Sequence, residues 1–355
     1  SRMGYWGPPE MDYTSPRRVS FNEWGSTFCG WHRGYDIAAS LMQLARMIDN
    51  VTATYPNEDL PSWMEWDTGY IRQLAENVYN KYLSVQGSAD DDVQSYIGKW
   101  FYLEEKGIAD GNDWSQIDAL VPQLVPLISD LGSYPLWFGW ASHYLFGMML
   151  RHYITFDRPI PASIQNKITS IQENHFTDLF DEPFRVKHSI INGSSTLFYG
   201  AERTTDMITS AWLQSLIMQV DFASSRPEIV QSMLDWIFGL NPSGICMMEG
   251  LGDRNLYQYH HRYASARNPT GAVPGALPKT VKLIQPTNNY AAANGFPNER
   301  EYIYEHFGDL AMVRNWPANP MYRDGAPSDP DEVWIPHNAM LMRLFTNLAE
   351  FNPLL

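Results

Sequence analysis

Apolar residues recur at helical spacing along most of this chain. Ile37, Leu41, Leu44 and Ile48 are separated by four, three and four residues, a repeat that places their side chains on one face of an α-helix. The same repeat, or a nearly continuous apolar run, predicts further helices within residues 69–83, 92–107, 115–131, 135–154, 161–180, 204–223, 224–242 and 337–351. Alternation typical of strands is confined to short pieces near 279–284. The pattern therefore predicts an all-helical protein.

Residues that favour helix ends mark the boundaries of the helix predicted within 224–242. Ser225 and Glu228 have the spacing of a capping box, and Pro227 falls in the first turn. Gly239 is placed for a C-terminal cap. The last predicted helix carries an apolar stripe formed by Met340, Leu341, Leu344, Phe345, Leu348 and Phe351.

The chain is predicted to form one domain spanning residues 1–355. Residues 1–29 are rich in Gly, Pro and Trp and are expected to be irregular. No polar linker separates the helices that follow them. The longest stretch without helical periodicity lies between residues 241 and 335, and a loop of that length inside a compact domain is usually functional.

Composition and charge limit the classes of molecule that this protein is expected to bind. Hydrophobic residues make up 44% of the chain and charged residues 18%, which is typical of a globular protein. No apolar run is long enough to span a membrane, and no signal-peptide pattern opens the chain. The net charge of −15, without a run of Lys and Arg, argues against nucleic acid. Aromatic residues reach 14%, enough to fill a core or to line a sugar-binding cleft. Cys29 and Cys246 can form one bridge or stay as two thiols.

Motifs with chemical significance are concentrated in the late stretch. They occur in this order: Gly-Leu-Asn-Pro at 239–242, His-His-Arg at 260–262, Pro-Gly-Ala-Leu at 274–277, and Glu-Val at 332–333 with Asn-Ala at 338–339. Together they resemble the motifs of glycoside hydrolase family 9, inverting cellulases and related glucosidases built on an (α/α)6 barrel. The resemblance implies that fold, and hydrolysis with inversion of a β-linked glucan or a related oligosaccharide.

The resemblance implies that Glu332 is the general acid that protonates the leaving glycosidic oxygen. An inverting glycosidase needs one protonated carboxyl group and a second carboxylate that activates water. Val333 and Trp334 beside Glu332 can exclude solvent, which raises a carboxyl pKa toward the range that an acid catalyst needs. The alternative is that Glu332 only lies near a helix N-terminus and favours its dipole.

The same resemblance implies a sugar-binding role for the His-His-Arg loop. His261 and Arg262 would hydrogen-bond sugar hydroxyls, and the planar guanidinium suits a pair of acceptors. The remaining predicted substrate contacts are His260, Tyr263, Trp31, His32 and His337. A metal site is not predicted, because adjacent histidines do not face one ion well and no HExxH pattern accompanies them. A structural loop tied down by its own hydrogen bonds is the other alternative.

The second carboxylate is predicted near the start of the first helix. Family members carry Gly-Trp-x-Asp-Ala-Gly-Asp, whose two Asp residues hold and deprotonate the attacking water, and residues 30–36 read GWHRGYD. Asp36 matches the second Asp, whereas Arg33 replaces the first. Asp36 is therefore the predicted base, with an N-cap of the helix as its alternative role. His32, Glu65 and Asp67 are alternative bases.

No cofactor is predicted. ADGNDW at 109–114 offers oxygen ligands of the kind that calcium prefers, but it lacks the EF-hand pattern, and a solvated turn is the favoured interpretation. The expected partner is a carbohydrate substrate, and the expected location is secreted or periplasmic rather than cytoplasmic.

Two other functions are consistent with the sequence. A polysaccharide lyase on the same toroid architecture would use a Tyr or His base and a cation that neutralises a uronate. His260, Tyr263, Arg267 and Asn268 would fit that chemistry. A carbohydrate-binding protein that has lost catalysis is the other, and Arg33 in place of an Asp is the feature that motivates it.

Overall fold

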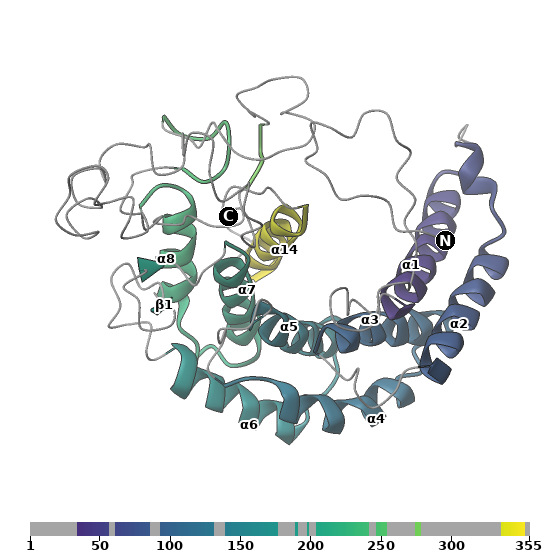
Figure 1. Cartoon of the computed structure of the whole chain (residues 1–355), viewed down its shortest axis with the longest axis horizontal. Helices are drawn as coiled ribbons and strands as arrows, with labels where there is room; N and C mark the ends of the chain where they lie inside the picture. The colour runs from purple at the N-terminus through teal and green to yellow at the C-terminus, as the bar shows by residue number, and fades with distance from the viewer. Residues whose placement is uncertain are drawn as a thin grey trace, which may run out of the picture. The chain divides into compact units, whose positions relative to one another are not determined.

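Helices account for most of the chain that the structure describes. The computed structural model (Figure 1) describes residues 34–56, 61–85, 93–130, 139–176, 189–190, 197–198, 204–240, 246–253, 274–277 and 335–351. Within these ranges, no helix is both long and apolar enough to cross a membrane.

The chain divides into two compact units, each assembled from separate stretches of sequence. The first contains α1 (Gly34–Thr54), η2 (Ser62–Glu65), α2 (Thr68–Val85), α3 (Val93–Ala109), α4 (Ser115–Leu124) and η3 (Val125–Leu127). The second contains nearly all of α5 (Gly139–Thr155), most of α6 (Ala162–Ile171), the π-helical turn η4 (Gln172–Phe176), β1 (Ser189–Ile190), β2 (Leu197–Phe198), α7 (Thr204–Val220), α8 (Pro227–Ile237) and α14 (Ile335–Phe351). The single domain over residues 1–355 stays a prediction.

In the first unit, α1 packs against both α2 and α3. Its buried residues are Tyr35, Ala38, Ala39, Met42, Ala45 and Ile48. Several of them are small, and small side chains let neighbouring helices approach closely. The predicted stripe is only partly right: Ile48 is buried, whereas Leu41 and Leu44 are partly buried beside it. The most buried face of α1 therefore does not coincide with its stripe of bulky aliphatic residues. The reason is that α1 packs against two helices, α2 and α3.

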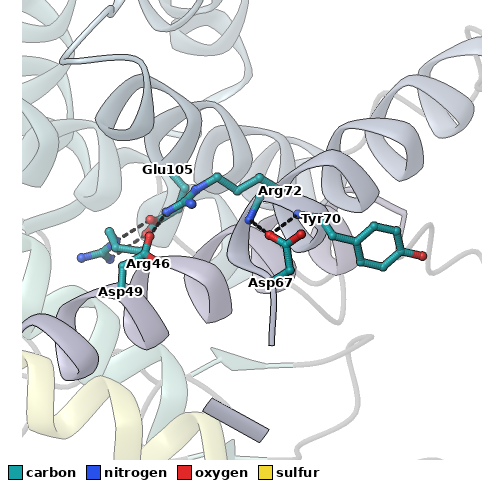
Figure 2. A network of polar contacts seen from close by, with 7 residues as sticks. Arg46, Asp49, Asp67, Tyr70, Arg72 and Glu105 are labelled. Atoms are coloured by element: carbon teal, nitrogen blue, oxygen red, sulfur yellow. Dashed lines mark hydrogen bonds and ion pairs between the residues drawn. The ribbon is translucent and has the colours of Figure 1, made fainter. Parts of the chain in front are cut away.

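Charged groups connect α1 with both of these neighbours (Figure 2). The Arg46 guanidinium of α1 makes two hydrogen bonds to the Glu105 carboxylate of α3, with Nε–Oε2 2.6 Å and Nη2–Oε1 2.8 Å. Asp49 of α1 pairs with Arg72 of α2. The Glu105 side chain is only 4% exposed, whereas that of Arg46 is 45% exposed. The carboxylate therefore depends on the guanidinium far more than the reverse.

These contacts shift the pKa values of the groups that make them. The hydrogen bond to Glu105 raises the pKa of Arg46. Burial by itself would raise the pKa of Asp49, but hydrogen bonds from Arg72 and Thr68 and the charge of Arg72 lower it. Both shifts favour the charged forms that the pairs require.

In the second unit, α7 packs against α8 and α14 (Figure 1). Its buried apolar residues lie all around the helix: Met207, Ile208, Ala211, Trp212, Leu213, Leu216, Ile217 and Met218. A helix with no polar face is an interior helix. The prediction of an inner helix within 135–154 is also confirmed, because α5 buries Leu145, Phe146, Met148, Met149, Leu150 and Tyr153.

Several buried polar side chains in this unit are paired between elements. The amides of Gln172 and Gln214 exchange hydrogen bonds of 2.9 and 3.1 Å. Asn347 of α14 donates to Ser215 Oγ (2.7 Å) and accepts from Gln219 Nε2 (2.9 Å) on α7. Each pair removes the cost of burying an unsatisfied polar group.

The stripe predicted for the last helix is right at three positions and wrong at one. Met340, Leu341 and Leu344 are buried, but Phe345 is 41% exposed and stacks on Phe238 with ring centroids 6.1 Å apart. The polar Asn347 lies on the buried face instead. Hydrophobic periodicity missed this position because the hydrogen bonds to α7 offset the polarity of the amide.

The ends of α8 confirm two predictions and correct a third. Pro227 is the first helical residue, and Gly239 has a φ of 119° just beyond the C-cap, as expected for a glycine cap. The capping box at Ser225 is wrong: the N-cap is Arg226 without a side-chain cap bond. The Ser225 hydroxyl donates instead to the Phe222 carbonyl (2.7 Å), which closes the preceding turn.

Two features have no counterpart in the sequence-based expectations. A short antiparallel pair joins β1 and β2, with Ser189 opposite Phe198 and Ile190 opposite Leu197. The helix predicted within 161–180 changes to the π-helical turn η4 at Gln172. Two-residue strands are too short to show alternation, and the 279–284 segment lies outside the described residues.

We expect the two partners of the Arg46–Glu105 pair to differ in their effect on stability. Arg46→Met keeps the aliphatic stem but leaves a buried carboxylate unpaired, and should cost about 3 kcal/mol of unfolding free energy. Glu105→Gln leaves a half-exposed guanidinium that water can solvate, and should cost about 1 kcal/mol. Denaturant unfolding of both variants measures the difference.

The double variant Arg46→Met/Glu105→Met is the control. It should be more stable than Arg46→Met alone, because it buries no charge. Equal losses for the two single variants would contradict the asymmetry.

Candidate active site

Asp36 lies inside the first turn of α1 rather than at its N-cap. The helix begins at Gly34, so the backbone of Asp36 is already helical, and its carbonyl accepts a hydrogen bond from Ser40 Oγ (2.8 Å). The side chain is partly buried. The N-cap alternative is therefore wrong. An acidic side chain in this turn is favoured by the helix dipole.

Tyrosine rings surround this first turn. Tyr35 is 1% exposed, and its ring centroid lies 5.1 Å from that of Tyr79 and 4.6 Å from that of Tyr82, both on α2. Tyr79 in turn stacks on Tyr102 of α3 at 4.1 Å. Burial raises the pKa of both Tyr79 and Tyr102 to about 12. These two phenols therefore stay neutral near pH 7 and cannot serve as bases there.

The other described carboxylates near this turn have different surroundings. Asp67 caps α2, since its Oδ1 accepts hydrogen bonds from the backbone amides of Gly69 (2.9 Å) and Tyr70 (3.2 Å), as Figure 2 shows. Glu65 is exposed at the end of η2. Because the Asp67 carboxylate already caps α2, Asp36 is the better candidate for the catalytic base.

The Pro-Gly-Ala-Leu motif at 274–277 is hydrogen-bonded on both sides. Toward the earlier part of the chain, the Glu249 amide donates to the Ala276 carbonyl (3.0 Å) and the Gly275 amide donates to the Glu249 carbonyl (2.7 Å). Toward α14, Asn338 Nδ2 donates to the Gly275 carbonyl (2.6 Å). Gly275 has a φ of 82°, which explains why glycine occupies this position. The motif therefore connects the segment around Glu249 with the first turn of α14.

His337 belongs to this connection as well. Its ring is fully buried (0% exposed), and Nδ1 lies 3.2 Å from the Leu277 carbonyl, within hydrogen-bonding distance. The ring therefore helps to hold the end of the motif against α14, and its role as a substrate contact stays a prediction.

Glu249 is a titratable group in this region that the sequence reasoning missed. One carboxylate oxygen, Oε2, is buried, and it has no hydrogen-bond partner among the described residues. Desolvation raises the pKa of Glu249. The available signal was an acidic residue directly after the apolar run Ile245–Met248 and before Gly250.

Cys246 lies three residues before Glu249 in the sequence. Its side chain is buried, and Sγ donates to the Met248 carbonyl at 3.5 Å. Burial raises the pKa of this thiol, which disfavours the reactive thiolate. Cys29 lies outside the described residues.

The acidic groups of the turn at 109–114 have protein partners. Asp110 pairs with Lys106 (2.9 Å), and Asp113 accepts a hydrogen bond from the Ser115 amide (3.0 Å). In the part of the chain that the structure describes, no group of three or more His, Cys, Asp or Glu residues is placed to hold a metal ion. The possible calcium site stays a prediction.

Most of the predicted site residues lie outside the described ranges. They are Trp31, His32, Arg33, His260, His261, Arg262, Tyr263, Arg267, Asn268 and Glu332. Glu332 shortly precedes α14, which begins at Ile335. Their roles stay predictions.

Comparison with known proteins gives one family. The model of the family described as "Glycosyl hydrolase family 9" matches residues 2–296. No curated protein matches the chain.

Two solved structures are similar at low identity. The structure described as "Bacteroides ovatus GH9" is 14% identical, with a TM-score of 0.47, over 90% of this chain and 53% of its own. AaCel9A in complex with cellobiose-like isofagomine is 16% identical, with a TM-score of 0.48, over 89% and 55% of the two chains. The chain thus spans about half the length of each.

Glu249→Gln should stabilise the protein at neutral pH. The pKa of Glu249 is higher in the folded than in the unfolded state, so its contribution to stability is fully present below the unfolded pKa and is lost as pH rises through the folded pKa. The neutral amide avoids that loss. Thermal melts should therefore show a higher Tm for the variant at pH 7, and nearly equal values at pH 4.

The exposed Glu76 in the middle of α2 provides a control. The difference in Tm between Glu76→Gln and wild type should not increase from pH 4 to pH 7. A Glu249→Gln effect of the same size at both pH values would show that the carboxylate is not desolvated.

Proposed function

The chain belongs to glycosyl hydrolase family 9, and from this premise we propose that it hydrolyses a β-linked glucan or a related oligosaccharide with inversion of the anomeric carbon. The match over residues 2–296 is the observation that carries the proposal. It includes Asp36 and the His-His-Arg motif. Glu332 lies beyond the matched range, and its role rests on the Glu-Val and Asn-Ala motif that opens α14.

Family membership also confirms the predicted fold class, an all-helical (α/α)6 barrel. In that class the reactive groups belong to loops and helix ends at one end of the barrel. Asp36 in the first turn of α1, and Glu332 just before α14, are both near helix N-termini in the sequence.

In the proposed mechanism, Glu332 protonates the leaving oxygen while Asp36 removes a proton from the attacking water. The water must fit between the sugar and the base, so the two carboxyl groups of an inverting enzyme stand about 6.5–9.5 Å apart. The placement of Asp36 supports its part of this mechanism, because the side chain is partly buried and does not cap the helix. Asp67 is already used as a cap.

The proposed substrate contacts are aromatic and cationic. His260, His261, Arg262 and Tyr263 would hydrogen-bond hydroxyls or contact ring faces, and Trp31 and His32 adjoin the base motif. Polymeric substrates of this kind are found outside cells, which is the ground for expecting a secreted or periplasmic enzyme.

The presence of Arg33 favours a second candidate function, that of a sugar-binding homologue without turnover. The family places an Asp where Arg33 stands, and two carboxylates hold a water better than one carboxylate beside a cation. This candidate predicts binding without product.

Glu332→Gln should lower kcat on unactivated glycosides by about 100-fold or more, since general acid catalysis contributes at least that much, and should leave binding nearly unchanged. Asp36→Asn should cause a loss of similar size. Product analysis with β-glucans, chitosan-type polymers and uronate-containing polymers measures the turnover and identifies the substrate.

The exposed carboxylate of Glu76 in α2 provides the control, and Glu76→Gln should keep wild-type turnover. NMR of the first products of a β-linked substrate should show the α-anomer. Turnover retained in Glu332→Gln would refute its role as the acid. Products that absorb in the ultraviolet would indicate a lyase, and binding without product would indicate the non-catalytic homologue.

A further inference from the structure

Helix α3 approaches the first turn of α1 at a glycine. A Cβ atom on Gly98 would collide with Oδ1 of the Asp36 carboxylate. It would also lie 2.8 Å from the Asp36 backbone nitrogen and 3.0 Å from Tyr35 Cβ. Contacts below 3.0 Å force a displacement of one of the partners. The Asp36 carboxylate therefore occupies the space that a side chain at 98 would need.

The backbone of Gly98 does not itself require glycine. Gly98 is in the interior of α3, and it is not one of the described glycines with positive φ. Glycine in a helix interior is less favourable than alanine, so its presence there needs a packing reason. The close approach of Asp36 provides that reason.

The rest of this turn has little freedom to adjust. Tyr35 is buried among the rings of Tyr79 and Tyr82, and a Cβ on Gly34 would collide with the Tyr82 side chain. Lys99 Nζ lies over the Tyr35 ring, 5.9 Å from its centroid. A Cβ atom at position 98 would therefore displace Asp36, whose carboxylate makes the closest contact and whose backbone nitrogen makes the next.

We propose that Gly98 is a positioning residue for Asp36: the bare backbone of α3 at this point determines where the carboxylate of the base lies. This inference rests on the proposed function, because it concerns the geometry of the proposed base. A methyl group at position 98 would turn the carboxylate away from its place while the residues that bind the sugar remain unchanged. Displacement of a reacting group by about 1 Å can cost about 100-fold in rate.

Gly107 offers a matched control in the same helix. A Cβ there would also collide, with ring carbons of Trp114 at 2.5 and 2.6 Å and with the Asp113 carbonyl at 2.8 Å. It lies at the other end of α3 from Gly98 and does not contact Asp36. Gly107→Ala therefore reproduces the steric strain without the effect on the carboxylate.

The test compares Gly98→Ala, Gly107→Ala and Asp36→Asn on the best polymer of the product panel. Gly98→Ala should lower kcat by about 10- to 100-fold with KM within about twofold of wild type. Gly107→Ala should lose stability but keep kcat within about twofold per folded molecule. Equal kcat values for the two glycine variants would overturn the proposal.

A stability cycle tests the contact without reference to activity. Gly98→Ala should lower Tm less in an Asp36→Ala background than in wild type, because the carboxylate that collides is gone. The same loss in both backgrounds, including failure of both to fold, would overturn the proposal. If Asp36→Asn keeps full turnover, the assignment of the base itself fails, whereas an inactive Asp36→Asn with a fully active Gly98→Ala refutes only the role of Gly98.

Discussion

Helices that are covered on several sides must satisfy their polar groups inside the protein, and this requirement shapes both units. Glu105 is almost fully buried in α3 and is acceptable there because Arg46 meets it with two hydrogen bonds. Gln172 and Gln214 satisfy each other in the second unit. An apolar core alone would allow many relative rotations of the helices, whereas each of these pairs requires one register.

Close approach between helices is the complementary requirement. Ala38 and Ala45 are small and fully buried in α1, and Gly98 of α3 leaves the space that the Asp36 carboxylate occupies. Polar pairs fix the rotation of a helix, and small residues fix its distance from the next. At the Asp36 carboxylate, the small residue is Gly98.

Hydrophobic periodicity was sufficient to locate the helices, because an interior helix and an amphipathic helix both leave long signals. It was insufficient for their exact faces. Asn347 replaces Phe345 on the buried face of α14 because a hydrogen-bonded amide can be buried at little cost, which no apolar scale expresses. The cap at Ser225 failed for a related reason, since its hydroxyl has a closer carbonyl acceptor. For the site, motif order led to the family, whereas the burial of His337 and of Glu249 depends on contacts between segments far apart in sequence.

The Pro-Gly-Ala-Leu motif is held by its main chain. Its partners on both sides bond to carbonyls and an amide of residues 275–277, so the bonding atoms are the same whichever side chains the motif carries. On α14 the situation is reversed, because the imidazole of His337 and the amide of Asn338 make the bonds themselves. We therefore expect amino-acid substitutions to be tolerated more readily in the motif than at the start of α14. Pro274, which is exposed, is free to vary, while the helix that follows Glu332 has to conserve the chemistry of two adjacent side chains.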